Sequence, residues 1–587
     1  MRVATLLLSL LACVMAAAAG AAERFEVGSG LPDFSLRDYR GKVHDQASFD
    51  EASLLVVAFL GNDCPLARLY GPRLAALADE YAAQGVRFVG VNSNVQDTPT
   101  EIGAFAQRYG IDFPLLKDAG NVLADQLSAQ RAPAVLVFDA DRKLRYRGRI
   151  DDQYGVGYQR SDATRNDLAT ALDELLAGQD VSVAQTEAPG CIIGRVQKIE
   201  PRGDVTFNRD VAPILNRRCV ECHREGELAP FPLTSYDEVV GWGEMICEVV
   251  SLGRMPPWFA NPEHGTFSND CSMSDNEKQV LHDWVAGGSP EGEPDDLPAS
   301  PEFVTGWNIG EPDAVYTMPE PFDVPAEGVI DYQYFLIDPG FEEDVWVSAA
   351  EARPDNTAVV HHIVLFAAPS NFDVDRAAQN GGPAGGQMVA IYAPGMRPWQ
   401  YPEGTAMKIR KGAKFVVQMH YTSCGTPQTD QSYVGLNFVD ESEVRKRIRY
   451  GMAINFQFEI PPGADNHIVT SKSTMRRDTT LLQLFPHMHY RGKAFRFEAH
   501  YPDGTQEVLL DVPHYDFNWQ LRYDLAEPKH LPRGTELHCT AVYDNSEENL
   551  VNPDPDETVR FGLQSFEEMM VGYYTSVRTY EDLTQDE

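Results

Sequence analysis

Positive charge is scarce in this sequence, and long apolar runs are missing beyond the N-terminus. Lys and Arg together number 49, against 87 Asp and Glu, which gives a formal net charge of −38. Such a chain would repel nucleic-acid phosphates, so a nucleic-acid partner is not expected. No stretch after residue 22 is long and apolar enough to cross a bilayer, so no transmembrane segment is predicted.

The apolar exception is the N-terminus itself, "MRVATLLLSLLACVMAAAAGAAERF". One arginine, an apolar run and small residues before Glu23 are typical of a secretory signal peptide over residues 1–22, cleaved near Ala21 or Ala22. We therefore expect a periplasmic or secreted protein, in which cysteines can pair. Eight cysteines follow the signal: Cys64, Cys191, Cys219, Cys222, Cys247, Cys271, Cys424 and Cys539.

A chain of 587 residues is too long for one hydrophobic core, so a multidomain protein is expected. Shifts in pattern and composition predict, after the signal peptide, an α/β domain, a small and mostly helical domain, a Pro- and acid-rich linker, and two β-sandwich, jelly-roll-like domains. Their predicted ranges are 23–195, 196–288, 289–321, 322–445 and 446–587.

The first domain alternates between strand and helix patterns. "SLLVVAFLG" predicts a buried strand, residues 65–84 a helix, and "VRFVGVNSN" a second strand. "APAVLVFDADRKLRYRGRI" predicts a later hairpin, and "TRNDLATALDELLAG" predicts a closing amphipathic helix. Strand–helix alternation with a late hairpin predicts an α/β sandwich.

These residues resemble the thioredoxin-like redoxin family. The reactive thiol of that family follows the first strand at a helix N-terminus, where Cys64 stands in "GNDCPLA" and where helix-end amides lower a thiol pKa. Pro133, in "RAPAVLVF", stands where the family has a cis-proline. Two positions depart from the family: Ala67 replaces the second cysteine of the disulfide reductases, and Gly61 replaces the threonine of the peroxidases.

Cys191, in "APGCIIG", is the only other cysteine near this domain. Two interpretations stay open: Cys64 is reactive and Cys191 resolves it, or the two form a structural disulfide in a domain that serves as a scaffold. The sequence also leaves open two further pairings, Cys247 with Cys271 and Cys424 with Cys539.

The second domain contains the run Cys219-Val-Glu-Cys222-His223. In an exported protein the C-x-x-C-H pattern predicts one covalently attached c-type haem, with both thiols bonded to the haem and His223 as an axial iron ligand. A zinc site would need further paired ligands, and a redox C-x-x-C would not need the histidine. One haem makes the domain an electron carrier by default.

Met255 is the predicted sixth iron ligand, because "SLGRMPPWF" looks like the Met-Pro segment of small cytochromes c. A thioether at that position raises the reduction potential. Met245, Met273 and His264 are the alternatives.

From residue 322 onward, short alternating strands and Gly, Pro and Asp turns predict β-sandwiches. Five of the 14 histidines fall in three apolar strand motifs, "TAVVHHIVLF", "KFVVQMHYTS" and "FPHMHYRG". Alternate side chains of a strand share a face, so His487 and His489 should point the same way. With the late methionines of "FEEMMVGYY", this donor set favours copper, because soft Cu(I) accepts a thioether.

This half of the chain resembles the copper type II, ascorbate-dependent monooxygenases, which include peptidylglycine and dopamine hydroxylases. The resemblance implies two copper ions, each in its own sandwich, facing one another across a solvent-filled cleft. The two ligand sets of the family match the following positions: His361, His362 and His420 for the first copper, and His487, His489 and Met569 for the second.

Neighbouring positions agree with the family in part. Met569 is chosen over Met570 because the family's methionine follows an acidic residue, here Glu568, and Tyr573 matches a nearby family tyrosine. The arginine that holds the peptide carboxylate in peptide hydroxylases is missing from the Phe485-Pro486 position. Peptide amidation is therefore not the predicted reaction.

The resemblance implies hydroxylation of a substrate C–H bond with O2, which would react at the methionine-containing site, with the other copper supplying the second electron. An ascorbate-like reductant or a periplasmic redox protein would be the external donor, and the adjacent haem domain is the predicted internal one. The substrate, a small molecule or a peptide-like compound, is not identified by the sequence. Two other classes stay open: a periplasmic thiol-redox or peroxide-handling enzyme that uses Cys64, and a non-catalytic copper-binding electron-transfer protein.

Overall fold

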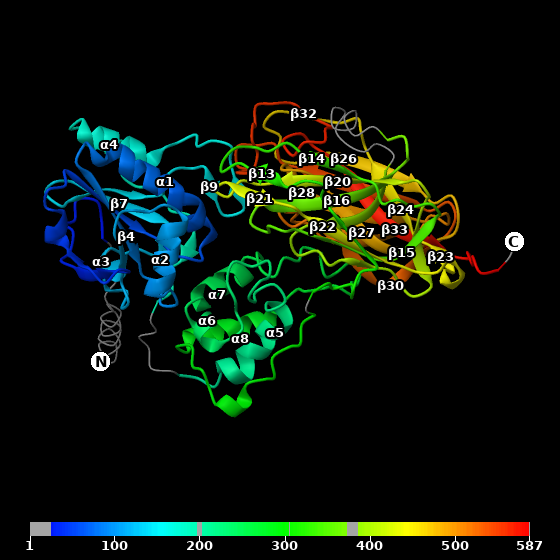
Figure 1. Ribbon diagram of the computed structural model, residues 1–587, viewed down its shortest axis with the longest axis horizontal. Helices are drawn as coiled ribbons and strands as arrows, with labels where there is room; N and C mark the ends of the chain where they lie inside the picture. Colours follow the sequence, from blue (N-terminus) through cyan, green and yellow to red (C-terminus); the bar gives the residue numbers. More distant parts are fainter. Residues whose placement is uncertain (1–24, 196–201, 305, 373–385, 586–587) are drawn as a thin grey trace, which may run out of the picture. The chain divides into compact units, whose positions relative to one another are not determined.

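The computed structural model of the protein describes residues 25–195, 202–304, 306–372 and 386–585 (Figure 1). The predicted signal peptide lies outside these residues. Contacts divide the chain into two compact units, the first built from Met1–Asp152 and Thr164–Val196, the second from Gln153–Ala163 and Gln197–Glu587. Residues 153–163, inside the predicted α/β domain, thus group with the second unit.

The first unit, blue to cyan in Figure 1, is built on one mixed sheet with the strand order β2–β1–β5–β4–β3–β7–β8. Its strands are β1 (Ser35–Asp38), β2 (Val43–Asp45), β3 (Leu54–Phe59), β4 (Val86–Asn92), β5 (Leu115–Lys117), β7 (Ala134–Phe138) and β8 (Leu144–Gly148). The helices are η1 (Gln46–Phe49), α1 (Pro65–Ala82), α2 (Pro99–Arg108), α3 (Val122–Gln126) and α4 (Asp167–Leu176). A separate short pair joins β6 (Arg131–Ala132) to β11 (Cys191–Ile192).

Strand β3 occupies the middle of this sheet because every one of its side chains is apolar and buried. It runs parallel to β4 and antiparallel to β7, which forms the predicted hairpin with β8. Helix α2 begins with a capping box between Thr98 and Glu101, which satisfies backbone N–H groups that a helix start leaves open. The predicted α/β architecture is confirmed.

The second unit starts with a small hairpin, β9 (Tyr154–Gly155) and β10 (Tyr158–Gln159), and continues after the undescribed residues 196–201 with a helical region. Its helices are η2 (Phe207–Val211), α5 (Ala212–Arg218), α6 (Tyr236–Val240), α7 (Gly243–Ser251), α8 (Asp275–Ala286) and η3 (Pro294–Asp296). Buried Trp284 of α8 packs on Phe207, with 6.0 Å between the ring centroids. A helical region is thus present where one was predicted; its assignment as a cytochrome stays a prediction.

Two sheets form the first β-sandwich. One has the order β12–β22–β15–β19–β23, with β18 on β15, and comprises β12 (Ala314–Thr317), β15 (Val345–Arg353), β18 (Trp399–Gln400), β19 (Thr405–Ile409), β22 (Tyr433–Phe438) and β23 (Lys446–Arg447). The other has the order β14–β20–β16–β17 and comprises β14 (Gln333–Ile337), β16 (Val360–Ala368), β17 (Gln387–Tyr392) and β20 (Lys414–Tyr421). Val347 and Leu436 from one sheet share a core with Ile363 and Val417 from the other. Strand β12 lies within the range predicted as a linker.

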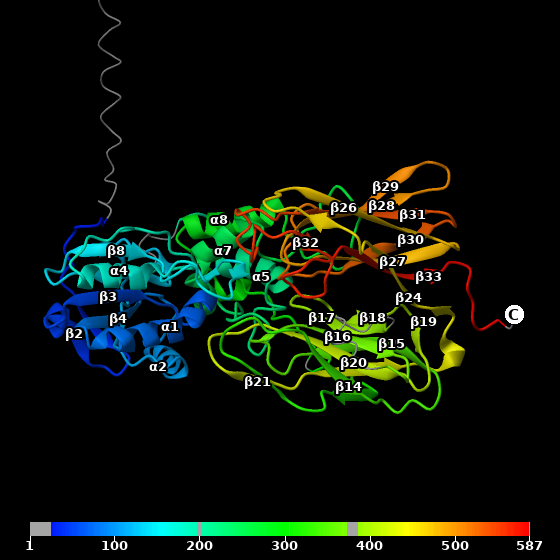
Figure 2. The same ribbon diagram turned by 90° about the horizontal axis from the view of Figure 1, so that it is seen from above.

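The second β-sandwich repeats this plan, and Figure 2 shows its strands apart from those of the first. One sheet, β24–β33–β27–β30, comprises β24 (Arg449–Ile454), β27 (Thr479–His487), β30 (Tyr523–Leu531) and β33 (Val571–Arg578). The other, β26–β31–β28–β29, comprises β26 (His467–Thr474), β28 (Gly492–His500), β29 (Gln506–Val512) and β31 (Glu536–Tyr543). Smaller elements are β13 (Phe322–Val324) with β21 (Gln428–Asp430), β25 (Glu459–Ile460) with β32 (Val559–Arg560), and η4 (Glu441–Glu443). The prediction of a β-rich C-terminal half is confirmed.

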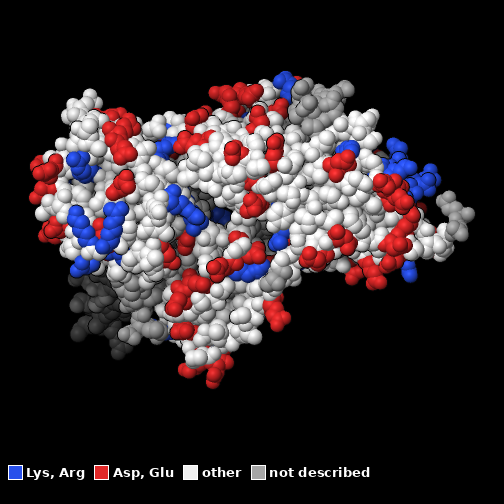
Figure 3. Space-filling view, viewed as in Figure 1, with Lys and Arg blue, Asp and Glu red and all other residues white. Residues whose placement is uncertain are grey.

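The surface reflects the composition. On the face drawn in Figure 3, acidic side chains are spread widely, and basic side chains form smaller groups among them. Within the described part of the chain, every helix is too short or too polar to cross a membrane.

Candidate functional sites

Cys64 lies at the junction between β3 and α1. It is the N-cap residue of α1, and its side chain is 1% exposed. Its thiol donates a hydrogen bond to the carbonyl oxygen of Ala132 at 3.1 Å. The following Ala132–Pro133 bond is cis, which confirms the cis-proline expected at that position.

Cys191 meets Cys64 beside this proline. Strands β11 and β6 pair antiparallel with Cys191 opposite Ala132, whose carbonyl group Cys64 contacts. The two cysteine side chains are hydrogen-bonded to each other, and both are thiols in this structure. The structure therefore brings together the two cysteines whose relation the sequence leaves open.

Opposing effects set the pKa of Cys64. Burial raises the pKa of the thiol, but hydrogen bonds from Cys191 and from the backbone N–H groups of Ala67 and Leu66 outweigh it. The pKa of Cys64 is consequently held below its ordinary value. Since the thiolate is the reactive form of cysteine, this environment favours redox chemistry over an inert buried thiol.

Gly190 allows Cys191 to approach the proline. Its φ is +131°, and a Cβ at this position would lie 2.3 Å from the carbonyl oxygen of Ala132. We expect Gly190→Ala to lower the free energy of unfolding by about 1–3 kcal/mol and to slow formation of a Cys64–Cys191 disulfide, because β11 must move away from β6. Urea denaturation and timed alkylation measure the two effects.

Gly178→Ala is the matched control. Gly178 also has a left-handed φ, +72°, but a Cβ there would meet nothing within 4 Å. This variant should lose stability without slowing disulfide formation. Equal rates of disulfide formation in the two variants would contradict the assigned role of Gly190.

The C-x-x-C-H residues form one tight turn after α5. The carbonyl oxygen of Cys219 accepts hydrogen bonds from the backbone N–H groups of Cys222, at 3.1 Å, and His223, at 2.9 Å. The Nδ1 atom of His223 bonds to the carbonyl oxygen of Phe231 at 3.1 Å, and Nε2 takes no part in this bond. Burial raises the pKa of Cys219 to about 12 and that of Cys222 to about 11. Both thiols are therefore protonated near neutral pH, and neither is activated as a thiolate nucleophile.

Met255, the predicted sixth ligand, is half-buried and precedes a cis-proline, Pro256. No distance in the structure decides between it and its alternatives, so this ligand stays a prediction. Cys271 is close enough to Cys219 and Cys222 to influence their ionisation, or to be influenced by it. Cys247 and Cys271 are both thiols here.

The remaining pair, Cys424 and Cys539, does not meet. Cys424 packs against the core of the first sandwich, where its thiol donates to the carbonyl oxygen of Thr426 at 3.5 Å. Cys539 lies in the core of the second sandwich. Both are thiols, so the structure gives no support to this pairing.

Three of the predicted histidines form one cluster. His361 and His362 lie on β16 and His420 on the neighbouring β20, with His362 opposite His420. The ladder shifts between Val360 and His362, and such a bulge lets consecutive side chains turn to one side. Potential ligand atoms of the three imidazoles all lie within 4.8 Å of one another.

This cluster has unused nitrogens. His361 Nε2 and His420 Nδ1 are buried and have no hydrogen-bond partner among the described residues. Burial lowers the pKa of His361 to about 4 and, together with neighbouring histidines, holds the pKa values of His362 and His420 well below the ordinary range. Neutral imidazoles with unpaired nitrogens are the form that binds a metal ion, and leaving them unpaired is costly.

His487 and His489 lie at the end of β27. Met488 between them is 0% exposed and belongs to the sandwich core, and His489 follows the last residue of the strand by two positions. Their ring centroids are 5.2 Å apart. His489 is fully buried, and its ring lies within reach of the backbone of Glu567 and Gln564.

Glu568 connects Met569 to this pair. Its buried carboxylate accepts hydrogen bonds from the backbone N–H groups of His489, at 2.9 Å, and Met569, at 3.1 Å. Met570 belongs to the sandwich core, and the neighbouring Met569 stays the predicted ligand. Tyr573 is half-buried and its ring lies 6.1 Å from that of His487. The structure therefore joins the backbone of Met569 to that of His489 through Glu568, and the role of Met569 as a ligand stays a prediction.

Sequence reasoning missed two residues from the loop between β29 and β30. The side-chain oxygen of Gln520 accepts a hydrogen bond from His487 Nδ1 at 2.7 Å, which leaves Nε2 available. Phe517 stacks on His361, with 5.0 Å between the centroids, and its centroid is 6.2 Å from that of His489. Neither residue belongs to a recognisable sequence motif, because only the conformation of the loop brings it close to the histidines.

Phe517 contacts histidines of both predicted ligand sets. The resemblance implies a solvent-filled cleft between the two sets of ligands. Here Phe517, 6% exposed, contacts His361 of the first set and His489 of the second. One aromatic side chain thus lies against both sets, and the solvent-filled cleft stays a prediction.

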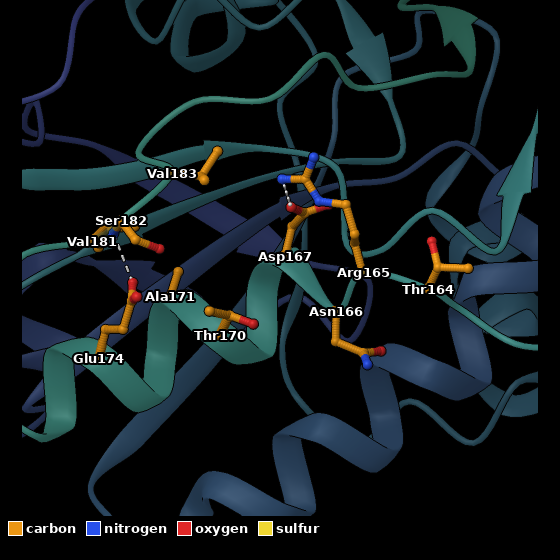
Figure 4. Close-up of a pocket in the computed structure, with 10 residues that line it drawn as sticks. All are labelled: Thr164, Arg165, Asn166, Asp167, Thr170, Ala171, Glu174, Val181, Ser182 and Val183. Atoms are coloured by element: carbon orange, nitrogen blue, oxygen red, sulfur yellow. Dashed lines mark hydrogen bonds and ion pairs between the residues drawn. The ribbon is translucent and has the colours of Figure 1, made fainter. Parts of the chain in front are cut away.

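A surface hollow of the first unit, drawn in Figure 4, lies beside α4 and away from all predicted site residues. Its polar groups bond to one another: Arg165 pairs with Asp167 at 2.8 Å, and the backbone N–H of Ser182 donates to Glu174 at 2.8 Å. The hollow therefore offers no evident chemistry.

The sheet, the cis-proline and the paired cysteines define the first unit as a thioredoxin-like redoxin domain. Residues 27–147 match the AhpC/TSA family. Among curated proteins, the chain is similar to the thiol-disulfide oxidoreductases ResA of Geobacillus thermodenitrificans, 27% identical over 119 residues, and of Halalkalibacterium halodurans, 27% identical over 112 residues. These matches cover 20% and 19% of this chain, and 67% and 62% of the relatives.

Solved structures give matches of similar extent. A hypothetical protein from Sinorhizobium meliloti, SMc02350, is 36% identical over 29% of this chain and 94% of its own, with a TM-score of 0.27. A secreted disulfide oxidoreductase of Mycobacterium tuberculosis is 24% identical over 19% of this chain and 79% of its own, with a TM-score of 0.18. The predicted redoxin domain is confirmed by the family match.

Proposed function

We propose that the redoxin domain carries out thiol–disulfide exchange, with Cys64 and Cys191 as its redox pair. The observation that carries this proposal is the hydrogen-bonded contact of the two side chains beside cis-Pro133. The similarity to proteins named thiol-disulfide oxidoreductases supports it. Cys191 acts in place of the second cysteine of the disulfide reductases, whose position in this chain is occupied by Ala67.

The solvent exposure of the two cysteines indicates which sulfur reacts first with a substrate. Cys64 is 1% exposed, whereas Cys191 is half-buried, so a substrate disulfide reaches Cys191 first. The Cys64 thiolate takes the proton of Cys191, and the resulting Cys191 thiolate attacks one sulfur of the substrate. The substrate S–S bond breaks, a Cys191–substrate disulfide forms, and the departing thiolate takes the proton held by Cys64.

Cys64 completes the exchange. Its thiolate attacks the sulfur of Cys191, forming the Cys64–Cys191 disulfide and releasing the second substrate thiolate, which water protonates. Two electrons have passed from the cysteine pair to the substrate. An external thiol must then reduce the pair for another turnover.

Turnover of a small aromatic disulfide, with a dithiol as the regenerating reductant, tests this function. We expect the full chain to exceed the uncatalysed exchange and Cys64→Ser to lose the enhancement. A wild-type protein no faster than an equal concentration of free cysteine would refute the proposal.

We further propose that the C-terminal half binds two copper ions and is a copper-dependent monooxygenase. The observation that favours this second function is the cluster of His361, His362 and His420, in which His361 Nε2 and His420 Nδ1 lack hydrogen-bond partners among the described residues. His361, His362 and His420 would hold one ion, and His487, His489 and Met569 the other. Copper bound at these residues would supply one-electron transfer and reaction with O2.

Neighbouring residues orient the predicted metal ligands. Gln520 holds His487 with Nδ1 as the donor, and Glu568 fixes the backbone of His489 and Met569. Phe517 packs against the rings of His361 and His489. The substrate, a small molecule or a peptide-like compound, would be hydroxylated at a C–H bond with O2 and an external reductant.

A covalently bound c-type haem at Cys219, Cys222 and His223 is proposed as the internal electron donor. The turn fits this group, since both thiols and the imidazole belong to one turn and the Phe231 carbonyl holds Nδ1, which leaves Nε2 for iron. The segment after Met255 contacts the second sandwich: Trp258 packs on Tyr523, with 5.0 Å between the centroids, and Phe267 bridges to Leu525. We propose a periplasmic or secreted location for all of these reactions.

Metal analysis of the full chain, expressed with haem-maturation machinery and loaded with copper, tests both cofactors. We expect two copper ions and one iron per chain, and Cys222→Ala should lose the covalently attached haem. If the chain contained iron but no tightly bound copper, the histidine clusters would have only a structural role. O2 consumption coupled to substrate then separates a monooxygenase from a copper-binding electron carrier.

A further inference from the structure

The loop between β4 and α2 contacts both segments that carry the redox cysteines. It starts at Asn92, the last residue of β4, and ends just before α2 at Thr98. The side chains of Asn92, Asn94 and Asp97 are each less than 5% exposed. Buried polar side chains persist where they make specific hydrogen bonds, so their partners show what the loop holds.

Asp97 holds the segment that leads into Cys64. One of its carboxylate oxygens accepts three hydrogen bonds: from the backbone N–H of Asn62 at 3.0 Å, from the Asn92 side chain at 2.6 Å and from the Asn94 side chain at 3.1 Å. Asn62 lies two residues before Cys64. A bond to its backbone therefore fixes the turn between β3 and the cysteine.

Asn94 holds the segment that follows Cys191. Its side-chain oxygen accepts a hydrogen bond from the backbone N–H of Gly194 at 3.0 Å, and the N–H of Val95 donates to the Gly194 carbonyl at 3.0 Å. Gly194 is thus held at both of its backbone groups. Because the other end of the Asn94 amide donates to Asp97, one side chain joins the two cysteine segments.

Gly61 makes room for this connection. A Cβ at Gly61 would lie 2.3 Å from the side-chain nitrogen of Asn94. The amide therefore occupies the space in which a threonine at position 61 would place its side chain. This explains in physical terms why the threonine of the peroxidases is missing here.

We propose that Asn94 and Asp97 are positioning residues that hold Cys64 and Cys191 in contact. This inference rests on the proposed thiol–disulfide function and assigns to it two residues outside the cysteine motifs. Together they form a bridge from Asn62 to Gly194 that limits the separation of the two sulfurs. Holding two thiols together raises their effective concentration and so favours their disulfide.

The test is the equilibrium of the Cys64–Cys191 pair with glutathione in the full chain, followed by alkylation and mass spectrometry. We expect Asn94→Ala to lower the equilibrium constant for disulfide formation by about tenfold, which makes the reduction potential less negative by about 30 mV. Asp97→Ala should act in the same direction. Asp97→Asn keeps an oxygen for the three donors and should restore the equilibrium constant to within about twofold of the wild-type value.

Asn166→Ala is the matched control, because Asn166 is exposed on the same unit and makes no capping hydrogen bond to α4. It should leave the potential unchanged. If Asn94→Ala does not fold, Gly61→Ala displaces the same amide from the other side and should shift the potential in the same direction. An unchanged potential in the folded variants would overturn the inference, whereas a wild-type chain that never forms the disulfide would overturn the proposed function instead.

Discussion

Cys64→Ser should leave a mixed disulfide on Cys191 that the protein cannot resolve. Cys191 is the more exposed member of the pair, and in this variant the buffer, in place of the Cys64 thiolate, takes the proton of Cys191 before it attacks the substrate disulfide. The second step does need the Cys64 thiolate, which the serine cannot supply. Mass spectrometry after brief exposure to a small disulfide should show one adduct per redoxin domain, on the peptide that contains Cys191.

Cys191→Ser is the complementary variant. It leaves the thiol of Cys64 beneath the substituted strand, where a bulky disulfide has little access. We expect its adduct to form at least about tenfold more slowly than that of Cys64→Ser, although Cys64 has the depressed pKa. Faster reaction of Cys64 in this pair of variants would reverse the roles assigned to the two sulfurs.

His420→Ala should reduce the bound copper from two ions to one per chain. The variant removes one of three imidazoles whose ligand atoms lie within 4.8 Å of one another, and two remaining histidines cannot close the site. Met569→Ala should weaken the other ion, since a weak thioether contributes less than an imidazole. Competition with a coloured copper chelator measures both affinities without any assay of activity.

His538→Ala is the control for a lost histidine. His538 lies on β31, bonds to Glu536 at 2.9 Å and stacks on His500, outside both clusters. Its variant should retain two ions. Equal copper content in His420→Ala and the wild type would contradict the first site, while equal loss in His420→Ala and His538→Ala would indicate general damage to the fold.

Much of the fold could be predicted because its signals are local. The apolar run of β3, the helix after Cys64 and the late hairpin each lie within one short segment, and all three form as expected. Alternation predicts His487 and His489 on one face of a strand, but β27 ends at His487 and the structure brings their rings to 5.2 Å from beyond the strand end. The adjacent pair of His361 and His362 required a β-bulge, which alternation does not predict.

Other features depend on contacts between distant segments. The meeting of Cys64 with Cys191 requires the pairing of β11 with β6, strands of two residues that leave almost no sequence pattern. Gln520 and Phe517 reach the histidines from a loop. The run "NSNVQD" at the end of β4 is unusual, because polar residues seldom follow a buried strand without a specific role. The sequence does not predict which segments these polar side chains bind, since their hydrogen-bond partners are distant in the chain.

The most direct test of the account is a redox titration of the wild-type chain in glutathione buffers, with free thiols alkylated and counted by mass spectrometry. The account predicts that Cys64 and Cys191 lose their alkylation together, in a single two-electron transition, and that digestion yields one cross-linked peptide containing both. A chain in which Cys64 and Cys191 remain separately alkylated under every oxidising condition would contradict it.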